Sequence, residues 1–282
     1  MEKVHNNHEF FRVPNIGNDI YPLKSVLMVG GKGIRLEPIT KNLIPKGFVT
    51  IDDKNEVREI DYLTQSLNNI GIQNPILSVH HYADTYEEYA SRKTYEIFRR
   101  KGEVGNGGAL EQLIQQYGYD TQYLVISADI FVHPKDIQKL ISEHKPETIS
   151  WGVTKLDYEL MEDYYGLVVD DKSKAILGDI KLPWWKNWDL MEKSLYVKGA
   201  IQIIDPSVYI ESVEIYKRLC KKAELDLYWD ISPLIEERNR RRIRVGKSSM
   251  LQAVIFDHAS LDYGTPERLQ IMRNEYQKLI NE

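Results

Sequence analysis

Apolar residues follow two different periods along the chain. Short runs rich in valine, isoleucine and leucine recur and are typical of buried strands. The strands predicted in this way span residues 25–29, 76–79, 123–127, 149–153, 166–169, 200–204, 242–245 and 253–256. Between several of them, apolar residues return every three or four positions, which predicts helices with one buried face. These helices span residues 60–70, 84–92, 109–117, 134–144, 206–222, 229–238 and 266–280.

The order of these elements predicts the fold class. Strands alternate with helices through the first half of the chain, which indicates βαβ units. Between residues 150 and 205, strands follow each other with less helix, as in a small antiparallel insertion. We therefore expect an α/β, Rossmann-like fold with a mixed, mainly parallel sheet covered by helices on both faces. No linker or repeat divides the sequence, so residues 24–282 are predicted to form one domain that follows an N-terminal arm, residues 1–23.

The composition narrows the class of protein. Apolar residues make up 42% of the 282 residues and charged residues 28%, which is the balance of a globular protein. A net charge of −5 gives no field that attracts nucleic acid or an anionic membrane, and no apolar run is long enough for a membrane span. The single cysteine, Cys220, cannot form an internal disulfide. We expect a cytoplasmic protein that holds anionic ligands only at a local site.

The segment after the first strand carries the clearest candidate chemistry. Gly30, Gly31 and Gly33 let backbone N–H groups turn towards phosphate oxygens without interference from a Cβ. Arg35 and Lys46 supply positive charge nearby. The prolines that follow prevent the long helix of a dinucleotide-binding fingerprint, and the P-loop needs serine or threonine where glycine follows the lysine here. The segment therefore predicts a phosphate site of another type.

The whole segment resembles the signature of the sugar-1-phosphate nucleotidylyltransferases, also called nucleoside-diphosphate-sugar pyrophosphorylases. The residues that match it in order and spacing are Gly30, Gly31, Gly33, Arg35, Leu36, Pro38, Thr40, Pro45 and Lys46. Other segments resemble further motifs in the family's order, at residues 105–110, 127–129, 165–168, 179–183, 199–201 and 262–268. The resemblance spans residues 24–275 and implies the GT-A-like nucleotidyltransferase fold, as a stand-alone transferase.

The resemblance also implies an activity and roles for individual residues. The enzyme would transfer a nucleotidyl group from a nucleoside triphosphate, GTP or UTP being favoured, to a sugar 1-phosphate and release pyrophosphate. Arg35 and Lys46 would be catalytic, and Asp129 and Asp262 would bind Mg²⁺. The glycines implied at the nucleotide are Gly30, Gly31, Gly33, Gly105 and Gly108, and the residues implied at the sugar phosphate are Gly166, Lys181, Lys198 and Gly199.

An alternative from another class is a catalytically silent homologue that binds sugar nucleotides and regulates a partner. Such a homologue can lose its charged site residues without losing the fold. The four charged residues in question, Arg35, Lys46, Asp129 and Asp262, are all present here, which favours an enzyme.

Two departures from the family pattern bear on the acceptor. Ile180 stands where the family usually has glutamate, and Lys198 stands where a small or neutral residue is commoner. The loss of a carboxylate and the gain of a cation favour an acceptor with an extra anionic or otherwise unusual group.

Several other clusters have ordinary explanations. The tryptophan cluster at 184–188 is typical of packing or of a subunit contact, as in a homo-oligomer, more than of stacking on a sugar. The arginine-rich stretch at 238–244 is typical of a solvated helix end, and Asp257 and His258 of a turn or surface. No partner residue supports a metal role for His80 and His81, which stay unassigned.

Overall fold

The computed structural model describes residues 22–102, 104–155, 166–170, 173–180, 196–223, 232–258 and 260–281. Lys181 and the tryptophan cluster at 184–188, both singled out from the sequence, lie outside the described residues. So does nearly all of the predicted N-terminal arm. None of the helices in the described ranges combines the length and apolar character that a bilayer span requires.

A nine-stranded sheet forms the centre of the molecule. Its strands are β1 (Leu23–Met28), β4 (Ile76–Val79), β5 (Glu96–Arg99), β6 (Gln122–Ser127), β8 (Ile149–Lys155), β9 (Gly166–Val169), β10 (Ile176–Ile180), β11 (Tyr196–Ile204) and β12 (Leu251–Ile255). The order along the main path is β10-β9-β11-β6-β1-β4-β5, and β8 pairs with both β11 and β12. Only β10 and β11 run against the other strands of this sheet. The predicted mixed, mainly parallel sheet is therefore confirmed, and the antiparallel part lies where the sequence indicated it.

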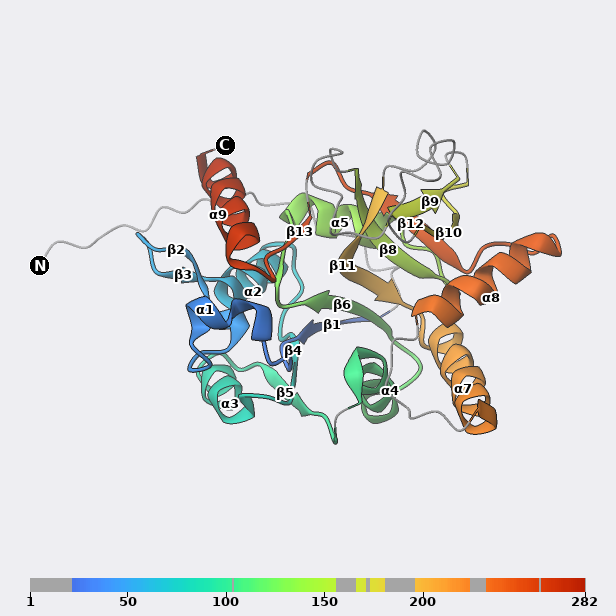
Figure 1. Cartoon of the computed structure of the whole chain (residues 1–282), viewed down its shortest axis with the longest axis horizontal. Helices are drawn as coiled ribbons and strands as arrows, with labels where there is room; N and C mark the ends of the chain where they lie inside the picture. Colours follow the sequence, from blue (N-terminus) through green and yellow to red (C-terminus); the bar gives the residue numbers. More distant parts are fainter. Residues whose placement is uncertain are drawn as a thin grey trace, which may run out of the picture.

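Helices cover both faces of the sheet because its strands are apolar on both sides. One group comprises α2 (Glu59–Asn69), α3 (Ala83–Ser91), α5 (Pro134–Glu143) and α9 (Pro266–Asn281), and the other α4 (Gly105–Tyr117), α7 (Pro206–Ala223) and α8 (Ser232–Arg244). In β1, Leu27 belongs to the hydrophobic core under the first group, whereas Val26 and Met28 belong to the core under the second. Figure 1 shows α2, α3 and α9 on one side of the central strands, and α4, α7 and α8 on the other.

Short elements complete the edge of the sheet where the strands end. After β1 come the 3₁₀ helix η1 (Ile34–Leu36), helix α1 (Glu37–Thr40) and the 3₁₀ helix η2 (Lys46–Phe48). Two small antiparallel pairs are formed by β2 (Thr50–Asp52) with β3 (Val57–Arg58), and by β7 (Ile130–Phe131) with β13 (Leu261–Asp262). The second pair joins the residues after β6 to the segment that precedes α9.

The strand predicted at residues 242–245 is wrong. Helix α8 continues through Arg244, and Gly246 ends it with a φ of +75°. The N–H of Lys247 donates to the carbonyl of Arg242, and the N–H of Gly246 donates to that of Ile243, the paired bonds of a glycine-terminated helix. Ile243 therefore belongs to the last turn of a helix and Val245 to the turn that follows it, which the local pattern alone does not distinguish from a strand.

A half-buried histidine at the end of α5 makes stability depend on pH. Burial lowers the pKa of His144 to about 4, although the Asp205 carboxylate acts in the opposite direction. Because a histidine in an unfolded chain has a pKa of about 6.5, the unfolded chain takes up this proton first as the pH falls. The contribution to stability is thus complete above pH 6.5, and roughly 2 kcal/mol of it should be lost by pH 4.5.

Urea titrations at pH 7 and pH 4.5 give the free energy of unfolding, and comparison with a variant isolates the contribution of His144, because burial also lowers the pKa of His133 to about 4. A His144→Gln variant, which keeps a hydrogen-bonding group near Ser150 Oγ, 2.8 Å from Nδ1 in the native ring, should lose less stability over this pH range. An equal loss in both proteins would contradict the assignment to His144.

Candidate active site

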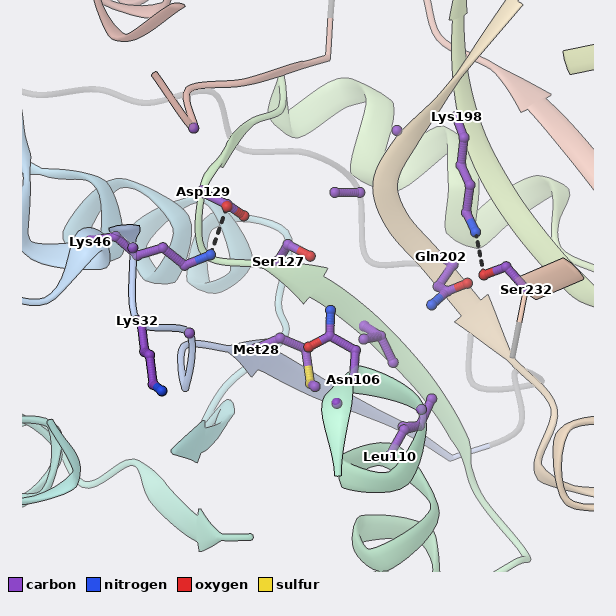
Figure 2. Close-up of a pocket in the computed structure, with 18 of the residues that line it drawn as sticks. Met28, Lys32, Lys46, Asn106, Leu110, Ser127, Asp129, Lys198, Gln202 and Ser232 are labelled. Atoms are coloured by element: carbon purple, nitrogen blue, oxygen red, sulfur yellow. Dashed lines mark hydrogen bonds and ion pairs between the residues drawn. The ribbon is translucent and has the colours of Figure 1, made fainter. Parts of the chain in front are cut away.

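One cavity of about 940 Å³ opens at the carboxyl ends of β1 and β6 and continues along β8 and β11. The glycine loop after β1 forms one wall and the start of α4 another. Figure 2 shows Lys32, Lys46 and Asp129 at one end of this cavity, and Lys198, Gln202 and Ser232 at the other. Open α/β sheets place their ligands at this edge, so the cavity is the candidate active site.

The glycine loop lies against the end of β4 and packs on a lysine side chain. A Cβ on Gly30 would lie 2.9 Å from the backbone nitrogen of His80, a contact that only glycine avoids. Cβ atoms on Gly31 and Gly33 would each come within 3.4 Å of the Lys46 side chain. Gly33 also has a φ of +70°. Gly31 and Gly33 therefore line the cavity over the aliphatic stem of Lys46, and Gly30 lies behind them.

An ion pair lies at the end of the cavity beside this loop. Lys46, in η2, places its Nζ atom 2.6 Å from Oδ2 of Asp129, which follows β6. The two side chains are 13% and 16% exposed, so water has limited access to the pair. A carboxylate and an ammonium group held together in a concave, partly desolvated site interact more strongly than a surface pair.

The backbone of a second aspartate lies beside that of Asp129 because β13 pairs with β7. Asp262 is opposite Ile130 in this ladder, and the N–H of Tyr263 donates to the carbonyl of Asp129 over 3.0 Å. The Oδ1 atom of Asp262 accepts hydrogen bonds from Arg268 Nη1, at 2.8 Å, and from the N–H of Gly264, at 3.0 Å. The two aspartates predicted to converge from distant parts of the sequence thus occupy neighbouring backbone positions.

The guanidinium group of Arg35 lies against Gly264, which follows this second carboxylate. A Cβ on Gly264 would lie only 2.5 Å from Arg35 Nη2. Both residues line the cavity. A glycine at this position therefore makes room for the Arg35 guanidinium group in the cavity.

The start of α4 forms another wall of the cavity. Gly105, the first residue of this helix, has a φ of +59°, and Asn106 and Gly107 line the cavity with it. The guanidinium group of Arg100 donates to the carbonyls of Gly105 and Gly30, each over 3.3 Å. Arg100 thus joins the glycine loop to α4 and fixes the width of the space between them.

The far end of the cavity contains another cation, Lys198. The register between β11 and β8 shifts between Lys198 and Gln202, and both side chains line the cavity. Lys198 Nζ lies 3.1 Å from Ser232 Oγ and 3.6 Å from the centroid of the Trp151 ring. A Cβ on Gly199 would lie 2.9 Å from the carbonyl oxygen of Gly152, so glycine allows β11 and β8 to approach here.

The structure brings most of the predicted site residues together. Those that line the cavity are Gly31, Gly33, Arg35, Lys46, Gly105, Asp129, Lys198 and Gly199, and Asp262 lies beside Asp129. Gly108 is buried within α4, and Gly166 begins β9; neither belongs to the cavity lining that the structure describes.

Sequence reasoning missed several lining residues. Arg100 follows β5, a four-residue strand with exposed charged residues at both ends that was not predicted. The sequence could have indicated Gln202, because it is a polar residue inside a predicted strand that is otherwise apolar. Nothing in the local sequence marked Trp151 or Ser232.

Another cluster, His133, Asp136 and His258, has three ligand atoms within 4.8 Å of one another. The Asp136 carboxylate already accepts the N–H groups of Asp257 and His258, and its Oδ2 lies 3.0 Å from His258 Nδ1. His133 Nδ1 accepts the N–H of Lys135, which leaves its proton on Nε2, the other ring nitrogen. These contacts fix the loop after β12 to the start of α5, consistent with the turn or surface role expected for Asp257 and His258.

Comparison with family models gives one match. Residues 24–180 match the model described as nucleotidyl transferase. No curated protein matches the chain.

Solved structures with the same fold act on different substrates. The inositol-1-phosphate CTP transferase from T. maritima is 18% identical, with a TM-score of 0.64 over 93% of this chain and 97% of its own. UDP-glucose pyrophosphorylase from Acinetobacter baumanii is 17% identical, with a TM-score of 0.67 over 92% and 98%. The CTP:phosphocholine cytidylyltransferase LicC from Streptococcus pneumoniae is 14% identical, with a TM-score of 0.62 over 91% and 100%. At these identities the likeness establishes the fold alone.

Proposed function

The chain belongs to the nucleotidyl transferase family, and from this premise we propose that it transfers a nucleotidyl group from a nucleoside triphosphate to a sugar 1-phosphate. The products are a nucleoside-diphosphate sugar and pyrophosphate. The observation that carries the proposal is the placement of Arg35, Lys46 and Asp129 in one cavity beside the glycine loop. Two polyanionic substrates meet in such a reaction, so the protein must supply positive charge and little covalent chemistry.

The cavity offers a position for each part of the reaction. A phosphate oxygen of the acceptor attacks the α-phosphorus of the triphosphate, a new P–O bond forms, and the bond to the β-phosphate oxygen breaks. Backbone N–H groups of the loop at Gly31 and Gly33 suit the phosphates of the donor. Lys46 suits the charge that develops at the α-phosphate, and Arg35 suits the departing pyrophosphate.

Asp129 and Asp262 fit a Mg²⁺ ion by the chemistry of their donors. Both are carboxylates on neighbouring backbone positions, and Mg²⁺ usually takes one or two carboxylates together with substrate phosphates. The bound ion would neutralise phosphate charge. Lys46 and Arg268 hold the two carboxylates in place.

The two ends of the cavity suit different substrates. The space between the glycine loop and α4, whose width Arg100 fixes, suits the nucleoside of the donor. The end beside β11 suits the acceptor. GTP and UTP are the donors expected from the sequence, and the UDP-glucose pyrophosphorylase and two CTP-dependent enzymes of the same fold make UTP and CTP natural first tests.

Pyrophosphate release tests the proposal directly. The purified protein with Mg²⁺ should release pyrophosphate only when a nucleoside triphosphate and a sugar 1-phosphate are both present, and one nucleobase should be preferred. The panel contains CTP, UTP, GTP, ATP and dTTP, each with neutral, acidic and amino sugar 1-phosphates. Tight triphosphate binding without pyrophosphate release in any combination would favour the silent homologue instead.

A further inference from the structure

A second cavity lies on the surface of the molecule, apart from the candidate active site. Its volume is about 780 Å³, which is within the range of cavities that bind small molecules. It lies where α2 and α3 end and β5 begins, and its lining includes Asn74, after α2, and Thr94, after α3. None of the described residues that line it also lines the active-site cavity. The proposed transfer reaction therefore gives this cavity no role.

The lining carries positive charge although the whole chain is acidic. Among the described residues that line the cavity, the cations are Arg58, Arg92 and Lys93, and Asp61 is the only carboxylate. The chain has a net charge of −5, so this excess of cations is a local feature. Cations in excess favour an anionic ligand and disfavour a hard metal ion, which requires several oxygen ligands.

One of these cations is held in a fixed position. Arg58 donates through Nε to Asp61 Oδ2 over 2.6 Å and through Nη2 to Oδ1 over 3.3 Å. The hydroxyl of Tyr89 donates to the same carboxylate over 2.9 Å. The guanidinium carbon of Arg58 lies 4.8 Å from the centroid of the Phe48 ring and 5.2 Å from that of the Tyr89 ring. A guanidinium group held in this way loses little conformational freedom when it binds a phosphate.

The rest of the lining suits the hydroxyl groups of a sugar. Its other polar groups are the amides of Gln65, Asn68, Gln73 and Asn74 and the hydroxyls of Thr64, Thr94 and Tyr95. Amides and hydroxyls both donate and accept hydrogen bonds, as sugar hydroxyls do. None of the described lining residues has a purely hydrocarbon side chain, so an apolar ligand would gain little there. A phosphorylated sugar combines the charge and the hydroxyl groups that this lining favours.

Packing connects this cavity to the candidate catalytic lysine. Phe48, which carries the Arg58 guanidinium group on its ring, belongs to η2 together with Lys46. The Phe48 ring also packs on the rings of Tyr86 and Tyr89 in α3, with centroids 5.1 and 5.4 Å away. A ligand stabilises the conformation to which it binds. Binding between Arg58 and the residues after α3 therefore favours the arrangement of η2 that places Lys46 in the active-site cavity.

We propose that the second cavity is a regulatory site that binds a phosphorylated sugar and increases turnover. The cations of the lining attract the phosphate of this ligand, and the amide and hydroxyl side chains bind its sugar. The contact between Arg58 and Phe48 transmits occupancy to η2 and so to Lys46. The inference goes beyond the proposed function, because this ligand is neither the donor nor the acceptor of the transfer.

Titration calorimetry with glucose 6-phosphate tests the binding, with glucose and inorganic phosphate as comparison compounds. Glucose 6-phosphate combines a phosphate with sugar hydroxyls, but it has no 1-phosphate to accept a nucleotidyl group. The native protein should bind it at least about tenfold more tightly than either comparison compound, since hydrogen bonds to charged groups add to those of the sugar. Equal binding of glucose 6-phosphate and one of the comparison compounds would reject the class of ligand.

Three variants locate the bound compound. Arg92→Gln with Lys93→Gln removes two exposed cations of the lining and should weaken the binding of glucose 6-phosphate at least about tenfold. Lys145→Gln with Lys247→Gln removes two exposed cations outside both cavities and should leave the binding unchanged. Lys46→Ala, in the active-site cavity, should bind within about threefold of the native protein. Native affinity in the Arg92 and Lys93 variant, or its loss in Lys46→Ala, would overturn the site.

Initial rates test the regulation. At saturating concentrations of the preferred triphosphate and acceptor, glucose 6-phosphate should raise kcat of the native protein by roughly fivefold or more. The variant Arg92→Gln with Lys93→Gln should not respond. Binding without a rise in kcat would reject the regulatory role, and inhibition that is competitive with the acceptor would place the compound in the active site. If no pair of substrates gives pyrophosphate, the proposed function fails, whereas calorimetry still decides whether the second cavity binds the phosphorylated sugar.

Discussion

Alanine in place of Lys46 is expected to lower kcat for pyrophosphate release by roughly 10²- to 10³-fold, or about 3–4 kcal/mol of transition-state stabilisation. The Nζ atom is the cationic group that the structure holds 2.6 Å from Asp129 in the cavity. Its loss removes positive charge where the α-phosphate would react, so the effect should appear in kcat more than in KM. Initial rates at saturating triphosphate and acceptor measure it.

A second variant separates the charge of Lys46 from its packing. Lys46→Met keeps an aliphatic stem against Gly31 and Gly33, which contact this side chain. It should lose nearly as much activity as the alanine variant. Lys145→Ala, at an exposed position, is the matched control and should retain the native rate. Near-native turnover in Lys46→Met would assign the lysine a packing role only.

Asparagine in place of Asp129 is expected to reduce the rate by roughly 10²-fold or more and to weaken the response to Mg²⁺. Asparagine keeps the shape of the side chain and an oxygen acceptor for Lys46, but it lacks the negative charge that a hard cation requires. The Mg²⁺ concentration that gives half the maximal rate should rise by at least about tenfold. Rates measured across a Mg²⁺ titration, after treatment with a chelator, test this.

The double variant Asp129→Asn with Asp262→Asn should abolish Mg²⁺-dependent release. Asp257→Asn is a suitable control, because that carboxylate is exposed and pairs with Lys139 outside the cavity. An unaltered Mg²⁺ titration in the double variant would remove both aspartates from the metal site.

The local sequence pattern predicted the strands and helices of the central sheet and its two covering layers well. The strands at 76–79 and 166–169 lie where the apolar runs placed them, since short β-branched runs have few alternatives in a two-faced sheet. The glycine loop was also predicted from the sequence. In the structure, Gly30 is required by its close approach to His80, and Gly33 by its positive φ.

The features that were not predicted from the sequence depend on contacts between distant segments. The stretch at 242–245 is β-branched, yet it continues α8, because Gly246 ends the helix beyond it. Arg100 acquires its position only when the glycine loop and α4 come together. The sequence associated Lys198 with the sugar phosphate, but its place at the end of the cavity away from Lys46 follows from the β11 bulge, which no pattern indicated.

The small β7–β13 ladder gives the molecule a weak point that differs from its sheet. The hydroxyl of Tyr263 donates to the carbonyl of Ala128, 135 positions earlier in the chain, and only two residues of each strand are paired. Closing so long a loop is entropically costly, and a ladder of two paired residues opens more readily than the longer strands of the central sheet. Opening of the β7–β13 ladder would move Asp262 and Gly264 away from the cavity while β1, β4 and β6 stayed folded. Enzymatic activity should therefore be lost at a lower denaturant concentration than the one that unfolds the central sheet.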